Sequence, residues 1–277
     1  MPQFQIVGSV QVRNEDVYVK QVVLNILDFC DKVIITDHRS TDRTFEICRW
    51  LADEHPKIEL SSIESPREAA IAIEPYFGTD TWIFGVDGDE VYDPQGLKIM
   101  RRQLLDGAFA KDFCVFGNVL NVTSLDMKRK TACGHLAPPS RSMTKLYNFF
   151  MIESWVNCPE RLLGDGLTFK DGFDANLRRY LHEELDWDAS PFRCLHMPFM
   201  KRSSTQKIRL SRTRLNPDEI NRIANETGGM TRLFRTIQLH LMNLLGRDWK
   251  NRKYRRGPRV EKDVSAFFQE YQLGGDV

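Results

Sequence analysis

The chain has 277 residues, a formal net charge of +1 and 42% hydrophobic residues. This length suits one large domain with or without an extension, and the composition excludes a disordered chain. Because the positive and negative charges nearly cancel, the composition does not indicate a nucleic-acid-binding protein. Six cysteines without a CxxC pair indicate a reducing compartment. We expect a cytoplasmic protein, because residues 1–12 lack the pattern of a secretory leader and no apolar run reaches the length of a membrane span.

The first third of the sequence alternates between predicted strands and predicted helices. Apolar runs predict strands at residues 4–12, 33–35, 58–63 and 82–86. Apolar residues at helical spacing, or a proline at a helix start, predict helices at residues 19–30, 45–52 and 66–77. Asn14 is a candidate N-cap of the first helix. This alternation predicts an α/β fold with a parallel sheet and right-handed crossovers.

The rest of the sequence is less regular. We expect a helix at 94–105, a strand at 113–122, a loop at 123–143 and an extended segment at 145–155. Beyond His196 the pattern becomes helical and basic, with an apolar face at 232–245 and dense Lys and Arg at 247–259. The basic segment has two interpretations, contact with anionic lipid headgroups or a solvated helix end, and the second is favoured. The apolar face is interpreted as a core or dimer-packing surface.

Three carboxylates directly follow the fourth predicted strand, in the sequence Asp87-Gly88-Asp89-Glu90. Ligands of open α/β sheets bind beyond the carboxyl ends of strands, and crowded carboxylates repel one another unless a cation lies between them. Paired oxygens suit a hard divalent ion, Mn²⁺ or Mg²⁺, that also binds phosphate. The alternative is a solvated Asp-Gly turn. The other motifs favour the metal site, with Asp89 as the first candidate ligand and Asp87 as the second.

Three motifs in order and spacing resemble the family 2 glycosyltransferases. They are Val12-Arg13-Asn14-Glu15, Asp37 with residues 40–44, and the acidic cluster at 87–90. Two later features make the chain similar to the subgroup that includes the lipopolysaccharide-core β-glucosyltransferases: Trp155 with Glu160-Arg161-Leu162-Leu163, and His196 followed by Ser203, Ser204 and Lys207. The resemblance covers roughly residues 4–207. Gly88 departs from it, since family members commonly have Ala there, and Pro159 replaces a frequent His.

This resemblance implies the GT-A fold, a Rossmann-like, mostly parallel central sheet flanked by helices. It implies a glycosyltransferase domain at 1–210, with a nucleotide-binding half at 1–93 and an acceptor-binding half at 94–210, and a helical, basic extension at 211–277. The implied reaction is a metal-dependent, inverting single displacement. It moves a sugar from a nucleoside diphosphate donor, expected to be a UDP-sugar, to a hydroxyl of a glycan or glycolipid. Peripheral contact with the inner face of a membrane is one option for the basic segment, and the donor sugar, the acceptor, the pathway and the oligomeric state stay open.

In such a fold the nucleotide lies across the strand ends. The resemblance then implies that the nucleotide-sugar is bound by Arg13, Asn14, Glu15, Asp37, Arg67 and Asp87. A carboxylate such as Asp37 accepts from a base N–H without competing as a donor. Asn14 is equally a plain helix cap, and Arg67 is equally an exposed residue that solvates its helix.

The chemistry needs a metal shell and a base. The candidate ligands are Asp87, Asp89 and, through the resemblance, His196, whose alternative is a packed structural histidine. Such a metal neutralises the leaving diphosphate. The candidate base that deprotonates the acceptor is Glu160, chiefly by resemblance, with Asp165 and Asp174 as rivals.

Other classes of protein fit less well. A sugar nucleotidyltransferase usually carries a glycine-rich loop after its first strand, where this chain has Arg13-Asn14-Glu15-Asp16. A non-catalytic sugar-nucleotide-binding protein stays open, and detectable sugar transfer separates it from an enzyme. A dehydrogenase ranks last, because no GxGxxG motif follows any predicted strand.

Overall fold

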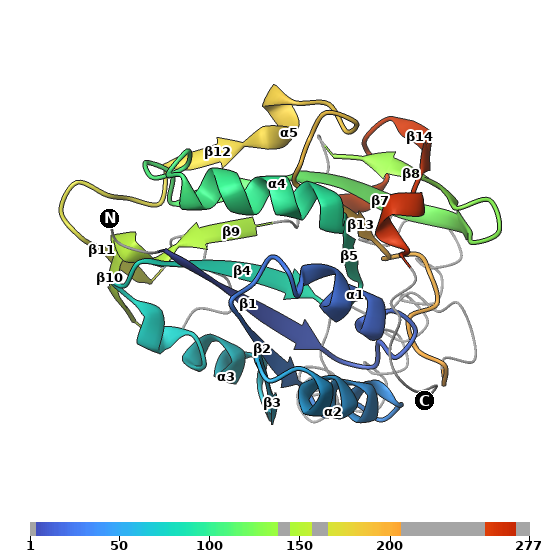
Figure 1. Ribbon diagram of the computed structural model, residues 1–277, viewed down its shortest axis with the longest axis horizontal. Coiled ribbons are helices and arrows are strands. Elements are labelled where there is room, and N and C mark those ends of the chain that lie inside the picture. Colours follow the sequence, from blue (N-terminus) through green and yellow to red (C-terminus); the bar gives the residue numbers. More distant parts are fainter. Residues whose placement is uncertain (1–3, 138–144, 157–165, 206–252, 270–277) are drawn as a thin grey trace, which may run out of the picture.

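The computed structural model describes residues 4–137, 145–156, 166–205 and 253–269 (Figure 1). Its main sheet has seven strands in the order β12-β6-β9-β4-β1-β2-β3. These strands are β1 (Gln5–Val12), β2 (Lys32–Asp37), β3 (Ile58–Ser62), β4 (Thr81–Asp87), β6 (Cys114–Phe116), β9 (Lys145–Asn148) and β12 (Arg178–Tyr180). All of them run in one direction except β9, which is antiparallel to both of its neighbours. The predicted α/β fold with a mostly parallel central sheet flanked by helices is confirmed.

Helices and short turns cover both faces of this sheet. The helices are α1 (Val19–Ile26), α2 (Thr44–Glu54), α3 (Pro66–Ile71), α4 (Pro94–Leu105) and α5 (Leu181–Glu184), and the 3₁₀ turns are η1 (Glu74–Tyr76), η2 (Phe149–Met151) and η3 (Ser265–Phe267). Alternate residues of β1 serve two cores, as strand geometry requires. Ile6 and Val10 pack with the apolar faces of α1, α2 and α4, whereas Val7 packs on the opposite face with Ile73 and Met151. The central strands are therefore buried on both sides.

A second sheet of five strands has the order β14-β8-β7-β13-β5. Its strands are β5 (Glu90–Tyr92), β7 (Asn118–Asp126), β8 (Thr131–Leu136), β13 (Arg193–His196) and β14 (Arg259–Asp263), and a separate hairpin pairs β10 (Ile152–Trp155) with β11 (Leu167–Phe169). Strand β5 follows the acidic cluster directly, and β13 pairs with it so that His196 lies opposite Glu90. The second sheet thus brings a late part of the chain against the end of β4.

The main sheet has a topological switch point at β1. The chain moves outward from β1 to β2 and β3, and then returns to place β4 on the other side of β1. The carboxyl ends of β1, β2 and β4 consequently lie at one edge of the sheet, with loops that leave in different directions. Such a point is where open α/β sheets bind their ligands.

Three predicted elements differ from the structure. The strand expected at 113–122 is two strands in two sheets, divided at Gly117, where a Cβ atom would lie 2.2 Å from the carbonyl oxygen of Phe192. Part of the loop expected at 123–143 is the β7–β8 hairpin. The helix expected at 66–77 ends at Ile71, because Pro75 has no N–H to donate to the Ile71 carbonyl and its ring would clash there.

Only residues 253–269 of the predicted helical extension at 211–277 are described, and they contain a strand. Residues 206–252 and 270–277, with the predicted helix at 232–245, lie outside the described residues. The described part, 253–269, contains strand β14, which pairs with β8, and the buried side chains of Val264 and Phe267. It packs into the same core as α1 and α4. No helix in the described ranges is long and apolar enough to cross a membrane.

Candidate active site

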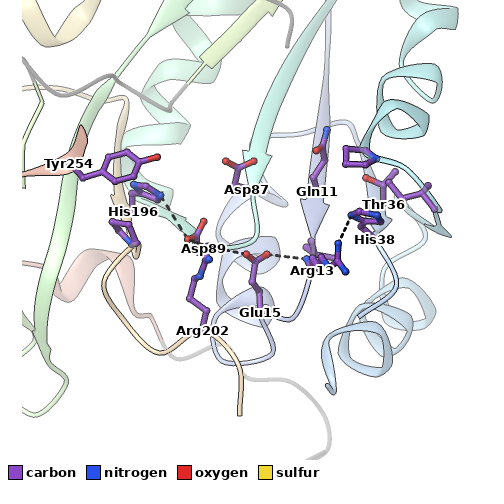
Figure 2. Close-up of a pocket in the computed structure, with 14 residues that line it drawn as sticks. Gln11, Arg13, Glu15, Thr36, His38, Asp87, Asp89, His196, Arg202 and Tyr254 are labelled. Carbon is purple, nitrogen blue, oxygen red and sulfur yellow. Dashed lines mark hydrogen bonds and ion pairs between the residues drawn. The ribbon is translucent and has the colours of Figure 1, made fainter. Parts of the chain in front are cut away.

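One cavity of about 270 Å³ lies at the switch point (Figure 2). One wall comes from the ends of the parallel strands: Gln11 and Arg13 at the end of β1, Thr36 and His38 at the end of β2, and Asp87 and Asp89 at the end of β4. The other wall comes from later segments and includes His196, Arg202 and Tyr254. The cavity joins carboxylates, an imidazole and guanidinium groups at the carboxyl edge of the sheet.

Asp89 is the most buried carboxylate that lines this cavity, with 2% of its surface exposed. Its Oδ2 atom contacts the guanidinium of Arg202, and the same Nη1 atom of Arg202 lies 3.3 Å from Oε1 of Glu15. Glu15 is itself 5% exposed. Buried carboxylates require a partner, and the guanidinium of Arg202 is one such partner for both Asp89 and Glu15.

His196 faces the same oxygen from the other side. Its Nε2 atom lies 3.8 Å from Asp89 Oδ2. Its Nδ1 atom lies 2.9 Å from Oδ1 of Asn121, whose amide nitrogen donates to the carbonyl of His135 at 3.3 Å. The amide oxygen therefore accepts from His196, Nδ1 carries the hydrogen, and the Nε2 lone pair points into the site. Burial lowers the pKa of His196 to about 4, so the imidazole is neutral at neutral pH.

These two residues fit a divalent metal ion. Ligands that share one Mg²⁺ or Mn²⁺ each lie about 2.1 Å from it and therefore about 3 to 4 Å from one another, which is the separation of Asp89 Oδ2 and His196 Nε2. Asn121 supplies the outer hydrogen bond that metal-binding histidines have. Across the described part of the chain, no three His, Cys, Asp or Glu side chains converge into a ready metal site. The predicted trio with Asp87 is thus not assembled, and phosphate oxygens of a ligand would complete the shell, as is usual for Mg²⁺.

Glu90, the third acidic residue of the cluster, lies in a different environment. It is fully buried; its Oε2 atom accepts from the Tyr92 hydroxyl at 2.8 Å and from the Asp87 backbone N–H at 3.3 Å. Its Oε1 atom has no hydrogen-bond partner among the described residues. Burial, followed by the charge of Asp87, raises the pKa of Glu90 to about 8. Glu90 is therefore mostly protonated at neutral pH and adds little charge to the site.

The loop after β1 is held against the loop after β2. Asn14 has a left-handed backbone, with φ of 54°, and its Oδ1 atom accepts from the Thr41 backbone N–H at 2.6 Å. Its own N–H donates to the Ser40 hydroxyl at 2.9 Å. Asn14 is not the N-cap of α1, because that helix begins at Val19 after Tyr18. Asn14 instead joins two strand-end loops beside the cavity.

Arg13 and His38 form the side of the cavity above β1 and β2. The His38 Nε2 atom donates to the Glu64 carbonyl at 2.9 Å, and its Nδ1 atom accepts from Arg13 Nη1 at 3.3 Å. The Arg13 backbone N–H lies 3.3 Å from Oε2 of Glu15. Arg13 is thus oriented by an imidazole and supplies a positive charge to the wall.

Three predicted nucleotide-binding residues do not line the cavity: Asn14, which lies beside it, and Asp37 and Arg67. Asp37 is 1% exposed; one carboxylate oxygen accepts from the Ser40 backbone N–H at 2.9 Å, and the other has no hydrogen-bond partner in the described part of the chain. Arg67 is exposed in the first turn of α3, where the neighbouring Pro66 reaches the cavity instead. Binding roles for Asp37 and Arg67 stay predictions.

The candidate base cannot be placed. Glu160 and Asp165 lie outside the described residues. Asp174 is exposed in the turn before β12. Because β12 runs parallel to β6 and β6 runs in the direction of β4, this turn lies at the amino edge of the sheet, opposite to the cavity. That position disfavours Asp174 among the three candidates.

Sequence reasoning missed three residues of the site. His38 follows Asp37 directly, so the position of the strand end was a signal that could have found it. Asn121 and Tyr254 had no local signal: Asn121 is placed by the pairing of β7 with β13, and Tyr254 comes from the C-terminal segment. The Tyr254 ring packs edge-on against His196, with centroids 4.8 Å apart. Both residues fix the imidazole.

Comparisons with known proteins give structural similarity at low identity. No family model matches the sequence, and no curated protein matches it significantly. A mannosyltransferase from Pyrobaculum calidifontis, solved with GDP-mannose and Mn²⁺, is 12% identical over 70% of this chain and 57% of that chain, with a TM-score of 0.42. Glucosyl-3-phosphoglycerate synthase from Mycobacterium tuberculosis, solved with Mn²⁺, UDP-glucose and phosphoglyceric acid, is 17% identical over 54% of this chain and 58% of that chain, with a TM-score of 0.34.

The same synthase solved with Mg²⁺ and UDP is 21% identical over 43% of each chain, with a TM-score of 0.27. This chain thus spans less than two thirds of each of these structures. Because all three TM-scores are below 0.5, these proteins do not decide the function of this chain.

Proposed function

We propose that the protein is a glycosyltransferase of the GT-A type that binds a nucleoside diphosphate sugar, expected to be a UDP-sugar, together with Mn²⁺ or Mg²⁺. One observation carries the proposal: at the switch point of the sheet, buried Asp89 and the lone pair of a neutral His196 face each other 3.8 Å apart in a cavity. The positively charged side chains of Arg13 and Arg202 line the same cavity. This combination suits a metal-bound diphosphate better than a nucleotide without metal, which the carboxylates would repel.

Each part of the donor has a matching group in the cavity. Asp89 and His196 would hold the metal, which supplies charge neutralisation for the leaving diphosphate when bound. Arg13, oriented by His38, points its guanidinium into the space above β1 and β2. Asp87 is half-buried at the end of β4 and is placed to accept from a sugar or ribose hydroxyl. The apolar side chains of Ile63 and Pro66 line the cavity and suit the nucleobase of the donor.

The transfer step proposed here is an inverting single displacement onto a hydroxyl of a glycan or glycolipid, with Glu160 as the base. Glu160→Gln should lower turnover by at least about 100-fold, the usual contribution of general base catalysis, while donor affinity stays within about twofold. Glu153→Gln, in the exposed part of β10, is the matched control and should behave as the unmodified protein. Normal turnover of Glu160→Gln would transfer the base role to another residue without touching the binding site.

The binding part of the proposal is tested by thermal unfolding with a panel of donors. UDP-glucose, UDP-galactose, GDP-mannose and the free nucleoside diphosphates are each added with Mn²⁺ and, separately, with EDTA. A ligand at about 100 times its Kd stabilises the folded state by about 2.7 kcal/mol. We expect that stabilisation with Mn²⁺ for at least one donor and its loss with EDTA.

Asp89→Asn should remove the Mn²⁺-dependent stabilisation, because the amide cannot replace a charged ligand. Asp28→Asn, which changes a carboxylate that is 74% exposed and outside the cavity, should leave it unchanged. A donor that stabilises Asp89→Asn as strongly as the unmodified protein would contradict the proposal. Chromatographic detection of a glycosylated acceptor, or only of bound donor, then separates an enzyme from a binding protein.

A further inference from the structure

A short segment after β13, residues 198–205, lies against the loop between β1 and α1. The Arg202 carbonyl accepts from the Val17 backbone N–H at 3.1 Å. The Ser204 backbone N–H donates to Asp16 Oδ1 at 2.6 Å, and the Ser204 hydroxyl donates to the same carboxylate. Three hydrogen bonds thus anchor this segment at Arg202 itself and two residues beyond it. The anchors direct its guanidinium inward.

Arg202 places its charge where the candidate metal would act. Its Nη1 atom contacts Asp89 Oδ2 and lies 3.3 Å from Glu15 Oε1, and both carboxylates are nearly inaccessible to water (Figure 2). Gly88 makes room for this arrangement, because a Cβ there would lie 2.1 Å from Glu15 Oε2. The cluster has two negative charges and one positive charge. The net charge of these three side chains is therefore −1 without any metal.

The Arg202 guanidinium and a metal ion would compete for the same carboxylate oxygen of Asp89. Asp89 Oδ2 is the atom that Arg202 contacts, and it is also the atom that faces His196 Nε2 at 3.8 Å. A dication on this oxygen would lie within a few ångströms of the guanidinium, where like charges repel strongly in a buried site. Metal entry therefore requires the guanidinium to leave Asp89. Once displaced from Asp89, Arg202 keeps Glu15 as an anionic partner, and a second anion would replace the contact that it loses.

We propose that Arg202 is an internal counter-ion that exchanges partners: it holds Asp89 until a metal ion enters, and it then moves onto the diphosphate of the donor. This inference rests on the proposed function, since it assumes the Asp89–His196 metal site. A diphosphate offers a guanidinium a bidentate anionic partner. The metal alone therefore removes the Asp89 contact of Arg202, leaves Glu15 as a remaining partner and binds weakly. Metal and nucleoside diphosphate together bind cooperatively, because the diphosphate receives the displaced guanidinium.

The test measures Mn²⁺ binding directly, from the electron paramagnetic resonance signal of free Mn²⁺ during titration. Arg202→Met keeps much of the side-chain volume and removes the charge. We expect it to bind Mn²⁺ alone at least about fivefold more tightly than the unmodified protein, the lower end of usual coupling between sites. The gain in Mn²⁺ affinity on adding UDP or GDP should shrink by a similar factor. Lys201→Met is the matched control, since it removes the same charge from an exposed neighbour outside the cavity, and should change neither quantity.

A second variant covers the case in which Arg202→Met does not fold, because it leaves Glu15 and Asp89 without their cation. Ser204→Ala keeps the buried cluster and removes the hydroxyl that donates to Asp16. It should release the segment in part and raise the affinity for Mn²⁺ alone by about two- to tenfold, the value of one hydrogen bond. Circular dichroism confirms that each variant is folded.

The outcomes separate this inference from the proposed function. If the folded Arg202→Met variant, or Ser204→Ala where Arg202→Met is unfolded, binds Mn²⁺ alone no more tightly than the unmodified protein, the exchange is refuted while the metal site stands. If neither the unmodified protein nor any variant binds Mn²⁺, with UDP, GDP or without nucleotide, both the exchange and the proposed metal site are refuted. Tighter binding in Arg202→Met with unchanged Lys201→Met supports the exchange.

Discussion

The two walls of the cavity differ in how far apart their residues lie in the sequence. The first wall is built from the ends of β1, β2 and β4, and each of its side chains lies within three residues of a strand end. The second wall combines His196 at the end of β13, Arg202 in the segment that follows, and Tyr254 from residues 253–269. The first wall presents the carboxylates together with Arg13 and His38, and its support is local. The second wall adds the imidazole and the guanidinium that face Asp89, and tertiary pairing holds them in place.

This difference teaches which part of such a site can change independently. The first wall belongs to the parallel sheet and forms whenever that sheet forms. The second wall depends on β13 pairing with β5 and β7, and on the C-terminal segment packing beside α1 and α4. If the second wall belongs to the same cooperative fold as the first, substitutions of residues that support it should lower the stability of the whole protein.

The largest effect is expected in the support of the second wall. Phe267 is 1% exposed and stacks on Trp187, with ring centroids 5.9 Å apart. Phe267→Ala should lower the free energy of unfolding by about 3–5 kcal/mol, as truncation of a buried phenylalanine does. Urea denaturation measures this free energy. Phe45→Ala is the control: the side chain of Phe45 is 37% exposed, so this variant should change the stability little. A loss below about 1 kcal/mol for Phe267→Ala would show that the C-terminal segment is not part of the common core.

Glu90, which is buried next to the first wall but does not line the cavity, gives the fold a pH dependence. Its pKa of about 8 in the folded chain lies above the ordinary glutamate value, so the folded state binds more protons between pH 4.5 and 8. The stability that Glu90 contributes is complete below this window and is lost as the pH rises through it. Glutamine stays neutral at every pH. The difference in unfolding free energy between Glu90→Gln and the unmodified protein should therefore shift by about 3 kcal/mol in favour of the variant as the pH rises from 5 to 8. Denaturation in EDTA at each pH measures this difference. A constant difference across this range would mean that Glu90 is ionised in the fold.

Gly88 tests the packing between the two walls. An added Cβ would lie 2.1 Å from Glu15 Oε2 and 2.9 Å from Val12 Cγ1, so Glu15 would have to shift away from Arg202. Gly88→Ala should destabilise the protein by about 1–3 kcal/mol. Gly85→Ala on the same strand is the matched control, because its added methyl meets Tyr147 at an ordinary 3.8 Å. Equal stabilities of the two variants would argue that Glu15 is not confined as the structure shows.

The smallest effect is expected at Tyr254. Its ring packs edge-on against His196 at 4.8 Å, and its hydroxyl accepts from Lys253 Nζ at 2.8 Å. Tyr254→Ala should weaken Mn²⁺ binding in the presence of nucleotide by about two- to tenfold, the range of an aromatic contact worth about 0.5–1.5 kcal/mol. Tyr254→Phe keeps the ring and should stay within about twofold. A phenylalanine variant as weak as the alanine variant would assign the effect to the hydroxyl instead.

The sequence predicted the first wall well because its signals are local. An apolar run that ends in Asp87 and Asp89 marks a strand end, and parallel strands place such ends at one edge of the sheet. The α/β class with a mostly parallel sheet followed from the alternation of elements. These features need no knowledge of contacts between distant segments.

The second wall was harder to predict because its positions depend on distant contacts. The break at Gly117, which sends β6 and β7 into different sheets, is set by the approach of the Phe192 backbone. Asn121 reaches His196 only through the β7–β13 pairing. Arg202 reaches Asp89 only because the segment after β13 packs on the loop after β1, and no local pattern in the sequence indicates this contact.

The most direct measurement of the central claim is an anomalous difference map from crystals grown with Mn²⁺ and UDP. The account predicts a single manganese peak in this cavity, within about 2.5 Å of both an Asp89 carboxylate oxygen and His196 Nε2, with the Arg202 guanidinium on the diphosphate. A nucleotide bound in the cavity with no manganese at these two residues, and with Arg202 still on Asp89, would contradict it.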